Sequence, residues 1–158
     1  MPTATYIALA NVTLTGSDSN IVFSSIPATY RDLVVVCSFN VASGNIRARF
    51  NSDTGNNYNM VRMYAGNGFG PASDSFSSTH FEFGDVSSGQ TTLLIDIMDY
   101  SATDKHKTTL SKDASAGDRI FYHANRFAST SAVTSIDIFR STGSFGSGDS
   151  FALYGIVS

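Results

Sequence analysis

The residues of this chain that could do acid–base or metal chemistry begin with its three histidines. His80, His106 and His123 stand in separate segments, without the close spacing that zinc ligands usually show. A catalytic triad need not be local in sequence, but no nucleophile-elbow pattern accompanies these histidines. We expect His123, which lies within the alternating residues 121–124, to face solvent or a neighbouring chain. The histidines therefore predict neither a metal site nor a triad.

Paired carboxylates are the second kind of chemistry to consider. A glycoside hydrolase needs two carboxyl groups that flank the bond it cleaves, and the acids near the strongest predicted strands are Glu82, Asp85, Asp96 and Asp99. Glu82 is the only glutamate in the chain, and we expect Asp96 and Asp99 to lie on a solvent face or beside a turn. Without a positioned set of acid, base and nucleophile, the sequence predicts no catalytic residues and no enzyme activity.

Two segments rich in turn residues resemble ligand loops. The glycines of residues 66–70 suggest a phosphate-binding loop, but Pro71 and more loop-like residues follow where that motif needs a helix. Residues 51–57 have a faint calcium-loop rhythm, but the bidentate acid that completes such a site is missing. We expect a flexible loop at the first and a turn held by Asx side chains at the second, with no metal and no cofactor.

Composition bounds the class of protein. The chain has 158 residues, which predicts one domain over 1–158 with an N-terminal arm over 1–5. Only 15% of residues are charged, against roughly 25% in typical proteins, and the net charge is −3 with no basic cluster. Nucleic acid is therefore not an expected partner. Residues 1–5 lack the features of a signal peptide, and no apolar run is long enough to cross a membrane.

The single cysteine, Cys37, excludes an internal disulfide framework. It lies within the apolar run of residues 33–37, where a free cysteine usually behaves as a small core residue. We therefore expect Cys37 to be buried and unreactive.

Hydrophobic residues alternate with a period of two, and clusters of Gly, Asn, Asp and Ser interrupt them. This pattern predicts an all-β fold: a two-sheet antiparallel sandwich, jelly-roll-like, with about nine or ten strands. The loops expected to be longest span 66–78 and 142–149, and residues 104–107 are expected to form a polar turn. Strands are expected at 6–15, 21–24, 32–41, 46–50, 58–65, from 81 onwards, 90–100, 108–111, 120–127, 132–140 and 150–157.

Aromatic residues gather near the first of these long loops: Tyr58, Tyr64, Phe69 and Phe76. They are either a small satellite core beneath the loop or a contact with another subunit, because Tyr and Phe are enriched at interfaces. The absence of tryptophan weakens a sugar-binding interpretation without excluding one based on tyrosine.

Three stretches resemble the small β-sandwich virion structural proteins of tailed phages, including cyanophages. They are residues 21–35 (IVFSSIPATYRDLVV), 49–58 (RFNSDTGNNY) and 150–156 (SFALYGI). The resemblance implies a structural protein of the particle, and the self-contained length favours a capsid decoration, or cement, protein. Such a protein would be assembled in the host cytoplasm and would sit on the capsid surface.

The implied partners are the major capsid protein and further copies of the chain, with a trimer plausible by analogy with other decoration proteins. We expect contacts through the N-terminal arm and through the loops 66–78 and 142–149. The alternative is a tail-fibre or baseplate protein that binds a host-surface glycan. A glycan-cleaving enzyme is a third possibility and would depend on Glu82 or a nearby aspartate.

Overall fold

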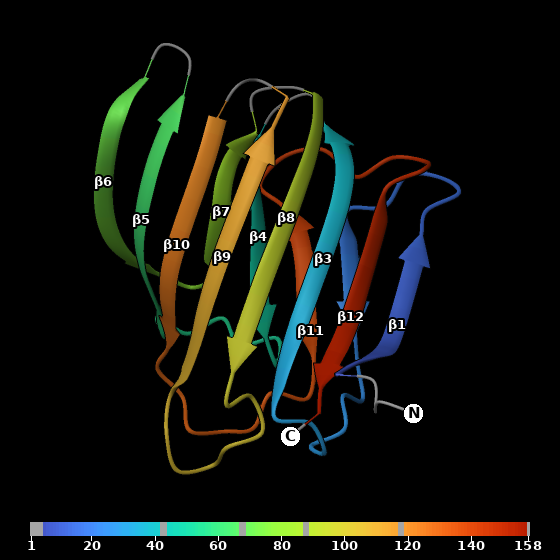
Figure 1. The fold of residues 1–158 in the computed structure, drawn as a ribbon, viewed down its shortest axis with the longest axis vertical. Helices are drawn as coiled ribbons and strands as arrows, with labels where there is room; N and C mark the ends of the chain where they lie inside the picture. The colour runs from blue at the N-terminus through green and yellow to red at the C-terminus, as the bar shows by residue number, and fades with distance from the viewer. Residues whose placement is uncertain (1–4, 42–43, 67–68, 87–88, 117–118, 158) are drawn as a thin grey trace.

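The computed structural model describes residues 5–41, 44–66, 69–86, 89–116 and 119–157. Over these residues the chain forms twelve strands in two antiparallel sheets that pack face to face (Figure 1). The predicted all-β sandwich is confirmed, with twelve strands in place of nine or ten. The described residues contain no helix of the length and hydropathy that crossing a bilayer requires.

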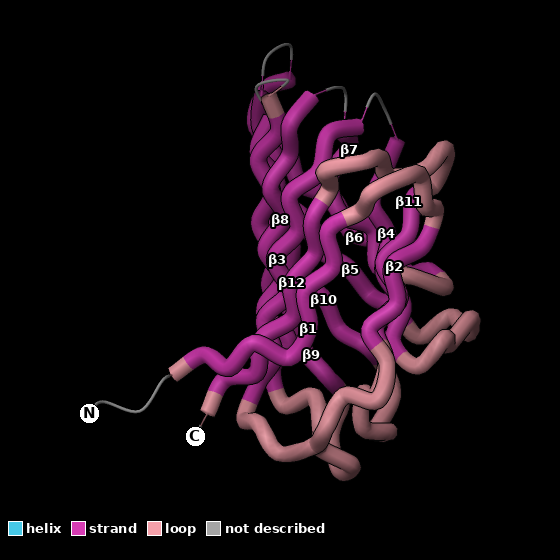
Figure 2. The backbone as a smooth tube through the Cα atoms, turned by 90° about the vertical axis from the view of Figure 1, so that its right-hand side faces the viewer, coloured by secondary structure: helices cyan, strands magenta, loops and turns pink. Residues whose placement is uncertain are grey.

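The two sheets differ in width. The large sheet has eight strands, in the spatial order β1 (Tyr6–Thr13), β12 (Ser150–Ile156), β3 (Asp32–Val41), β8 (Gly89–Met98), β9 (Lys107–Ser115), β10 (Arg119–Phe127), β5 (Tyr58–Gly66) and β6 (Phe69–Ser78). The small sheet has four, in the order β2 (Asn20–Phe23), β11 (Ile136–Arg140), β4 (Gly44–Phe50) and β7 (Phe81–Val86). The edge-on view in Figure 2 shows the small sheet on one face of the large sheet, whose other face carries no second layer.

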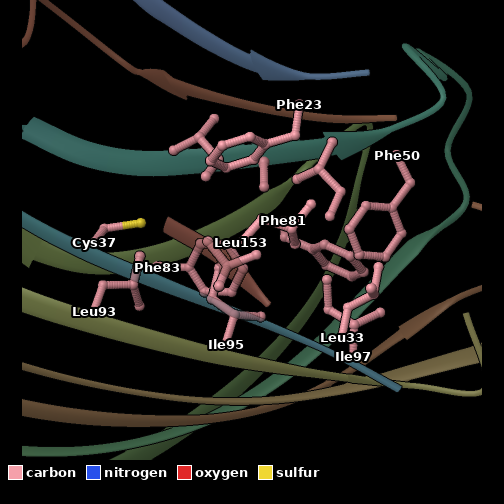
Figure 3. Close-up of a cluster of buried hydrophobic side chains, with 14 of the residues drawn as sticks. Phe23, Leu33, Cys37, Phe50, Phe81, Phe83, Leu93, Ile95, Ile97 and Leu153 are labelled. Atoms are coloured by element: carbon pink, nitrogen blue, oxygen red, sulfur yellow. The ribbon is translucent and has the colours of Figure 1, made fainter. Parts of the chain in front are cut away.

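The alternation in the sequence decides which side chains enter the core. In β3, Leu33, Val35, Cys37 and Phe39 point inward and are almost completely buried. They meet apolar side chains of β8 and β12 within the sheet and phenylalanines of the small sheet across the gap (Figure 3). Cys37 is buried as expected, and burial raises the pKa of its thiol far above the ordinary value. It is therefore a core residue without nucleophilic character.

Aromatic rings fill the middle of the sandwich. Phe81 of β7 contacts Phe50 and Tyr58 edge-on, at ring-centroid distances of 5.3 and 4.8 Å. Phe127 of β10 completes this cluster, at 5.5 Å from Phe50 and 5.0 Å from Tyr58. Burial of the Tyr58 hydroxyl raises its pKa to about 12. Tilted and edge-on ring pairs of this kind stabilise a core beyond the area that they bury.

The small sheet covers only part of the large one. Its edge strand β7 packs against β9, β10 and β5, and Figure 1 shows β5 and β6 projecting past it on one side. The large sheet therefore has a middle that carries the core and a flank, β5–β6, that the small sheet covers less. β6 is exposed along most of its length, and among its described side chains Phe76 is the one that packs against the core.

The expected loop over 66–78 is wrong, because residues 69–78 form β6, which pairs with β5. Glycine, proline and four serines suggest a loop by propensity, but an edge strand tolerates them because its outer backbone edge needs no partner. β9 is also longer than the expected 108–111, and β11 is shorter than the expected 132–140. Tertiary pairing overrides propensity at these strands.

The loop over 142–149 is present, and the core holds it in place. Phe145 is completely buried and stacks edge-on with Phe151 at 4.7 Å. The Asp149 carboxylate accepts hydrogen bonds from the backbone N–H groups of Asn40 and Gly146, both at 2.8 Å. The loop therefore serves as a lid on one end of the core, and its exposed residues are the segment around 142–144 together with 147–148.

Lys107, expected in a polar turn, is the completely buried first residue of β9. Its ammonium group donates to the carbonyl oxygens of Lys105, Thr130 and Ser129, at 2.9, 3.1 and 3.4 Å. Burial lowers the pKa of the group. Three carbonyl partners compensate part of the cost of removing the charge from water, so Lys107 ties the loop before β9 to the loop after β10.

Gly155 in β12 generates a prediction about packing. The ring of Tyr30 lies directly over its Cα, and a Cβ built at this position would meet the ring at a distance that real contacts do not show. The Tyr30 backbone N–H donates to the Tyr100 hydroxyl at 3.2 Å, and that hydroxyl donates to the Pro27 carbonyl, which fixes the segment. Gly155→Ala is expected to lower the free energy of unfolding by about 1–3 kcal/mol through overpacking.

Chemical denaturation measures this effect, and Gly16→Ala is the matched control because nothing lies within 4 Å of its Cβ position. Equal stability of the two variants would contradict the packing argument.

Candidate docking face

The structure corrects the expected position of His123. It is 3% exposed and points inward between the sheets, not towards solvent or a neighbouring chain. In β10, Phe121, His123, Asn125 and Phe127 face the core while the residues between them face out. The core-facing and the outward-facing residues of β10 both include large apolar side chains, so the sequence pattern did not identify which face is the inner one.

His123 belongs to a polar part of the sandwich interior. Its Nε2 lies 3.6 Å from Asp113 Oδ1 on β9, and the two side chains are 0% and 5% exposed. The Asn125 amide donates to the Thr109 hydroxyl at 3.0 Å. Further buried oxygens in this layer have no hydrogen-bond partner among the described residues: Thr91 Oγ1, Ser111 Oγ, Ser115 Oγ and Asn125 Oδ1.

A histidine beside a carboxylate has the groups for general acid–base catalysis. Here both groups lie beneath the small sheet, with Phe83 and Phe121 packed against the imidazole ring. This packing encloses the pair within the sandwich interior. We therefore interpret Asp113 and His123 as an internal polar contact in the sandwich.

The half-buried flank next to this layer holds an ion pair. Arg62 of β5 donates two hydrogen bonds to Asp74 of β6, at 2.6 and 2.9 Å, and its guanidinium lies over the rings of Tyr64 and Phe76. The hydrogen bond to Asp74 raises the pKa of Arg62 and lowers that of Asp74. Of the aromatic residues expected in this region, Tyr58 lies in the core, Tyr64 and Phe76 form this flank, and the Phe69 side chain lies outside the described part.

The structure does not bring the candidate carboxylates together. Glu82 lies on β7 and accepts two hydrogen bonds from Arg47, at 3.0 and 3.1 Å. Asp96 is half-buried in β8 of the large sheet, and Asp99 is exposed after it, 3.5 Å from Lys105. These two positions agree with the expected solvent face and turn. The Asp85 side chain lies outside the described part.

The remaining candidates are placed as follows. Asp53 holds the turn over 51–57, because its carboxylate accepts from the Gly55 N–H at 2.6 Å and the Asn57 amide at 2.9 Å, which confirms the Asx turn. His80 is half-buried and 3.8 Å from Glu82, and His106 is exposed. Residues 67–68 of the glycine-rich segment and residues 1–4 of the arm lie outside the described residues. Within the described ranges, no three His, Cys, Asp or Glu side chains gather where they could share a metal ion.

The outer face of the large sheet is the most distinctive surface of the molecule. Residues that alternate with the core positions of β5, β9 and β10 point to solvent there. Five of them are large apolar side chains with exposed fractions between 47% and 62%: Val61, Met63, Leu110, Ile120 and Tyr122. The strand register places Tyr122 directly beside Met63 and beside Lys112. These residues are named the outer apolar patch below.

Shallow hollows continue across this face. One of about 430 Å³ lies over β10, β5 and β6 and is lined by Met63, Tyr64, Ala65, Pro71, Ala72, Ser73, Ile120 and Tyr122. A second, of about 520 Å³, lies further along the same strands and includes Val61, Ala124 and Arg126. Open hollows of this kind suit the side chains of a docked protein better than a small ligand, which is usually enclosed.

The face is large enough for a stable protein contact. Eight strands at about 4.8 Å spacing, each about eight residues long, give roughly 34 by 27 Å, or roughly 900 Å². A standard protein interface buries about 800 Å² per partner. The charged side chains on the outer face of β8, β9, β10, β5 and β6 are Asp96, Lys112 and Arg126, so docking here would desolvate few ions.

No protein-family model matches the chain, and no curated protein matches it.

Asp113 generates a prediction about pH. Burial raises the pKa of its carboxyl, and His123 nearby offsets part of the rise, so the folded state favours the protonated acid. This contribution to stability is complete below the ordinary carboxyl pKa and is lost as the pH rises through the raised value. Asp113→Asn keeps the shape without the charge, so its free energy of unfolding is expected to increase relative to wild type as the pH rises from about 3.5.

Urea unfolding at a series of pH values measures this difference. A difference that is constant with pH, or that falls as the pH rises, would contradict the assignment.

Proposed function

We propose that this chain is a virion structural protein of a tailed phage, a capsid decoration protein that docks on the major capsid protein through the outer face of its large sheet. The single observation that carries the docking part is the outer apolar patch, which lies on a broad face with no second layer. The viral part rests on the resemblance of residues 21–35, 49–58 and 150–156 to phage virion proteins.

The composition of the patch supports a protein partner. Tyrosine and methionine are enriched at protein interfaces, and large apolar patches on a soluble domain mark contact sites. Tyr122 and Met63 lie near its centre, where residues that carry most of a binding energy tend to gather. On the outer face of β8, β9, β10, β5 and β6, Lys112 and Arg126 exceed the single Asp96, so the complementary surface has an apolar centre and acidic groups opposite these two cations.

Such a protein would act through the rigidity of its sandwich and through the number of copies on the capsid lattice. A sandwich whose strands all pair within two sheets presents its face without reorganisation, so little entropy is lost on docking. Many copies on a regular lattice reinforce one another, because each copy that bridges neighbouring capsid subunits makes the separation of those subunits more costly. Function in this proposal is interface geometry, and no step of it needs catalysis.

The proposal predicts that a charge in the outer apolar patch abolishes docking without unfolding the protein. Tyr122→Asp and Met63→Asp are each expected to weaken binding to emptied, expanded capsids by at least about tenfold, which is about 1.4 kcal/mol. Both side chains are more than half exposed, so the melting temperature should change little. Val22→Asp is the matched control, because Val22 is 49% exposed on the small sheet.

Antibodies to the purified protein first identify the particles that carry it, and sedimentation of the variants with those capsids then gives the affinities. Labelling confined to the tail would overturn the capsid proposal. Retention of the protein on host polysaccharide would then favour the tail-fibre alternative. Equal loss of binding in Val22→Asp would show that the outer apolar patch is not the docking site.

A further inference from the structure

The free edge of β6 is a second surface of the molecule, distinct from the outer apolar patch. β6 ends the large sheet and pairs with β5 on one side only, and Figure 1 shows no strand beyond it. The described backbone hydrogen bonds of residues 72–78 run to β5. Every second backbone N–H and C=O along this segment therefore points away from the sheet, as a template for another strand.

The other three sheet edges carry features that discourage strand pairing. β1 has a bulge between Ala8 and Ala10, and β2 is only four residues long. β7 has an irregular register opposite Asn45 and Ile46, and its Glu82 N–H is covered by the Met60 sulfur at 3.0 Å. Short strands, bulges and covered edges are the usual protections.

In β6 such protection is confined to one end. Pro71 and the register shift between Tyr64 and Gly66 blunt the start of the strand. Residues 72–78 contain no lysine, proline or bulge. The one charge among them, Asp74, points inward and is neutralised by Arg62. This stretch is therefore an open, regular edge.

We propose that a second copy of this chain pairs with this edge through its own β6, antiparallel, about a two-fold axis at Ser75. The two large sheets would join into one continuous sheet. The interface is isologous, so it closes after two copies and does not propagate into a fibre.

The charges and the proline select this register. Opposed residues in an antiparallel pair must face the same side, so the axis passes through a residue. An axis at Asp74 would place two carboxylates opposite each other, which is destabilising. An axis at Ser73 would bring Pro71, which lacks an N–H, into the ladder. The axis at Ser75 separates the two aspartates, sets Asp74 opposite Phe76 of the partner copy, and uses residues 72–78 in full.

The side chains beside the edge favour a second copy over a foreign peptide. A peptide that adds to a sheet edge obtains its specificity from pockets for alternate side chains. The residues on the outer face along this edge are Ser73, Ser75 and Ser77, whose short side chains line the two open hollows and form no enclosed pocket. A second β6 is already an ordered strand, so its pairing loses little conformational entropy, and small side chains on both copies allow close approach.

The pairing has a consequence for the outer face. A two-fold axis perpendicular to the sheet keeps both outer faces on the same side. The hollow that includes Pro71, Ala72 and Ser73 lies at the seam, so the two outer apolar patches would form one bivalent surface. The proposed dimer depends on the β6 edge alone. It does not require that the outer apolar patch docks on a capsid.

Cysteine cross-linking tests the register. With the axis at Ser75, the two Cα atoms of this residue lie about 4.5–5.5 Å apart, within disulfide range. Ser75→Cys is therefore expected to give a covalent dimer under mild oxidation. Ser73→Cys is the matched control, because its copies would be about 14 Å apart along the strands, four residues at about 3.4 Å. Cys37 is completely buried and does not interfere.

Analytical ultracentrifugation tests the dimer without cross-linking. Ser75→Lys places like charges opposite each other and is expected to weaken the dimer at least about tenfold, whereas Thr13→Lys on the opposite edge should leave it unchanged. A monomer at millimolar concentration, a trimer, or equal cross-linking of both cysteine variants would overturn the proposal. A dimer lost in Tyr122→Asp but kept in Ser75→Lys would also overturn it, because the contact would then be the outer face.

Discussion

The unequal width of the two sheets is the constraint on which the rest of the structure depends. Four strands cannot cover eight, so the aromatic core forms where they overlap, around Phe50, Tyr58, Phe81 and Phe127. Within the overlap, the inner face of the large sheet changes from apolar side chains on β3 and β8 to a buried polar layer on β9 and β10, beneath the edge strand β7. The Arg62–Asp74 pair stands where core burial gives way to solvent.

The single covered face of the large sheet and the mismatch in width together leave the two surfaces that the molecule offers to others. A wide sheet with one covered face leaves the opposite face uncovered, and the projecting flank leaves β6 without a neighbour. The two surfaces are perpendicular to each other, one along the strand faces and one along the backbone edge. Each can be occupied without blocking the other, so lateral joining and docking on a lattice are compatible in one particle.

Sequence alone predicts those parts of the structure in which local pattern and tertiary environment agree. Residues 32–41 are rich in β-branched and other apolar residues and form β3 with the expected bounds, and Cys37 takes the expected core position. Asp53 forms its Asx turn because the bonds are local. Prediction failed at β6, where pairing with β5 overrides loop propensity, and at His123 and Lys107. Their burial depends on carboxylate and carbonyl partners that are distant in sequence. The outer apolar patch has a similar origin, since Ile120 and Tyr122 are surface residues only because no second layer covers that face of the large sheet.

The pairing of β1 with β12 brings the first and last described residues together, and the Val157 N–H donates to the Thr5 carbonyl at 3.0 Å. A chain with adjoining ends is suited to circular permutation. A short linker could join the old termini, and new ones could be opened in the exposed turn over residues 52–56. Cargo genetically fused to the new termini would lie at the rim of the sandwich, away from the outer face of the large sheet.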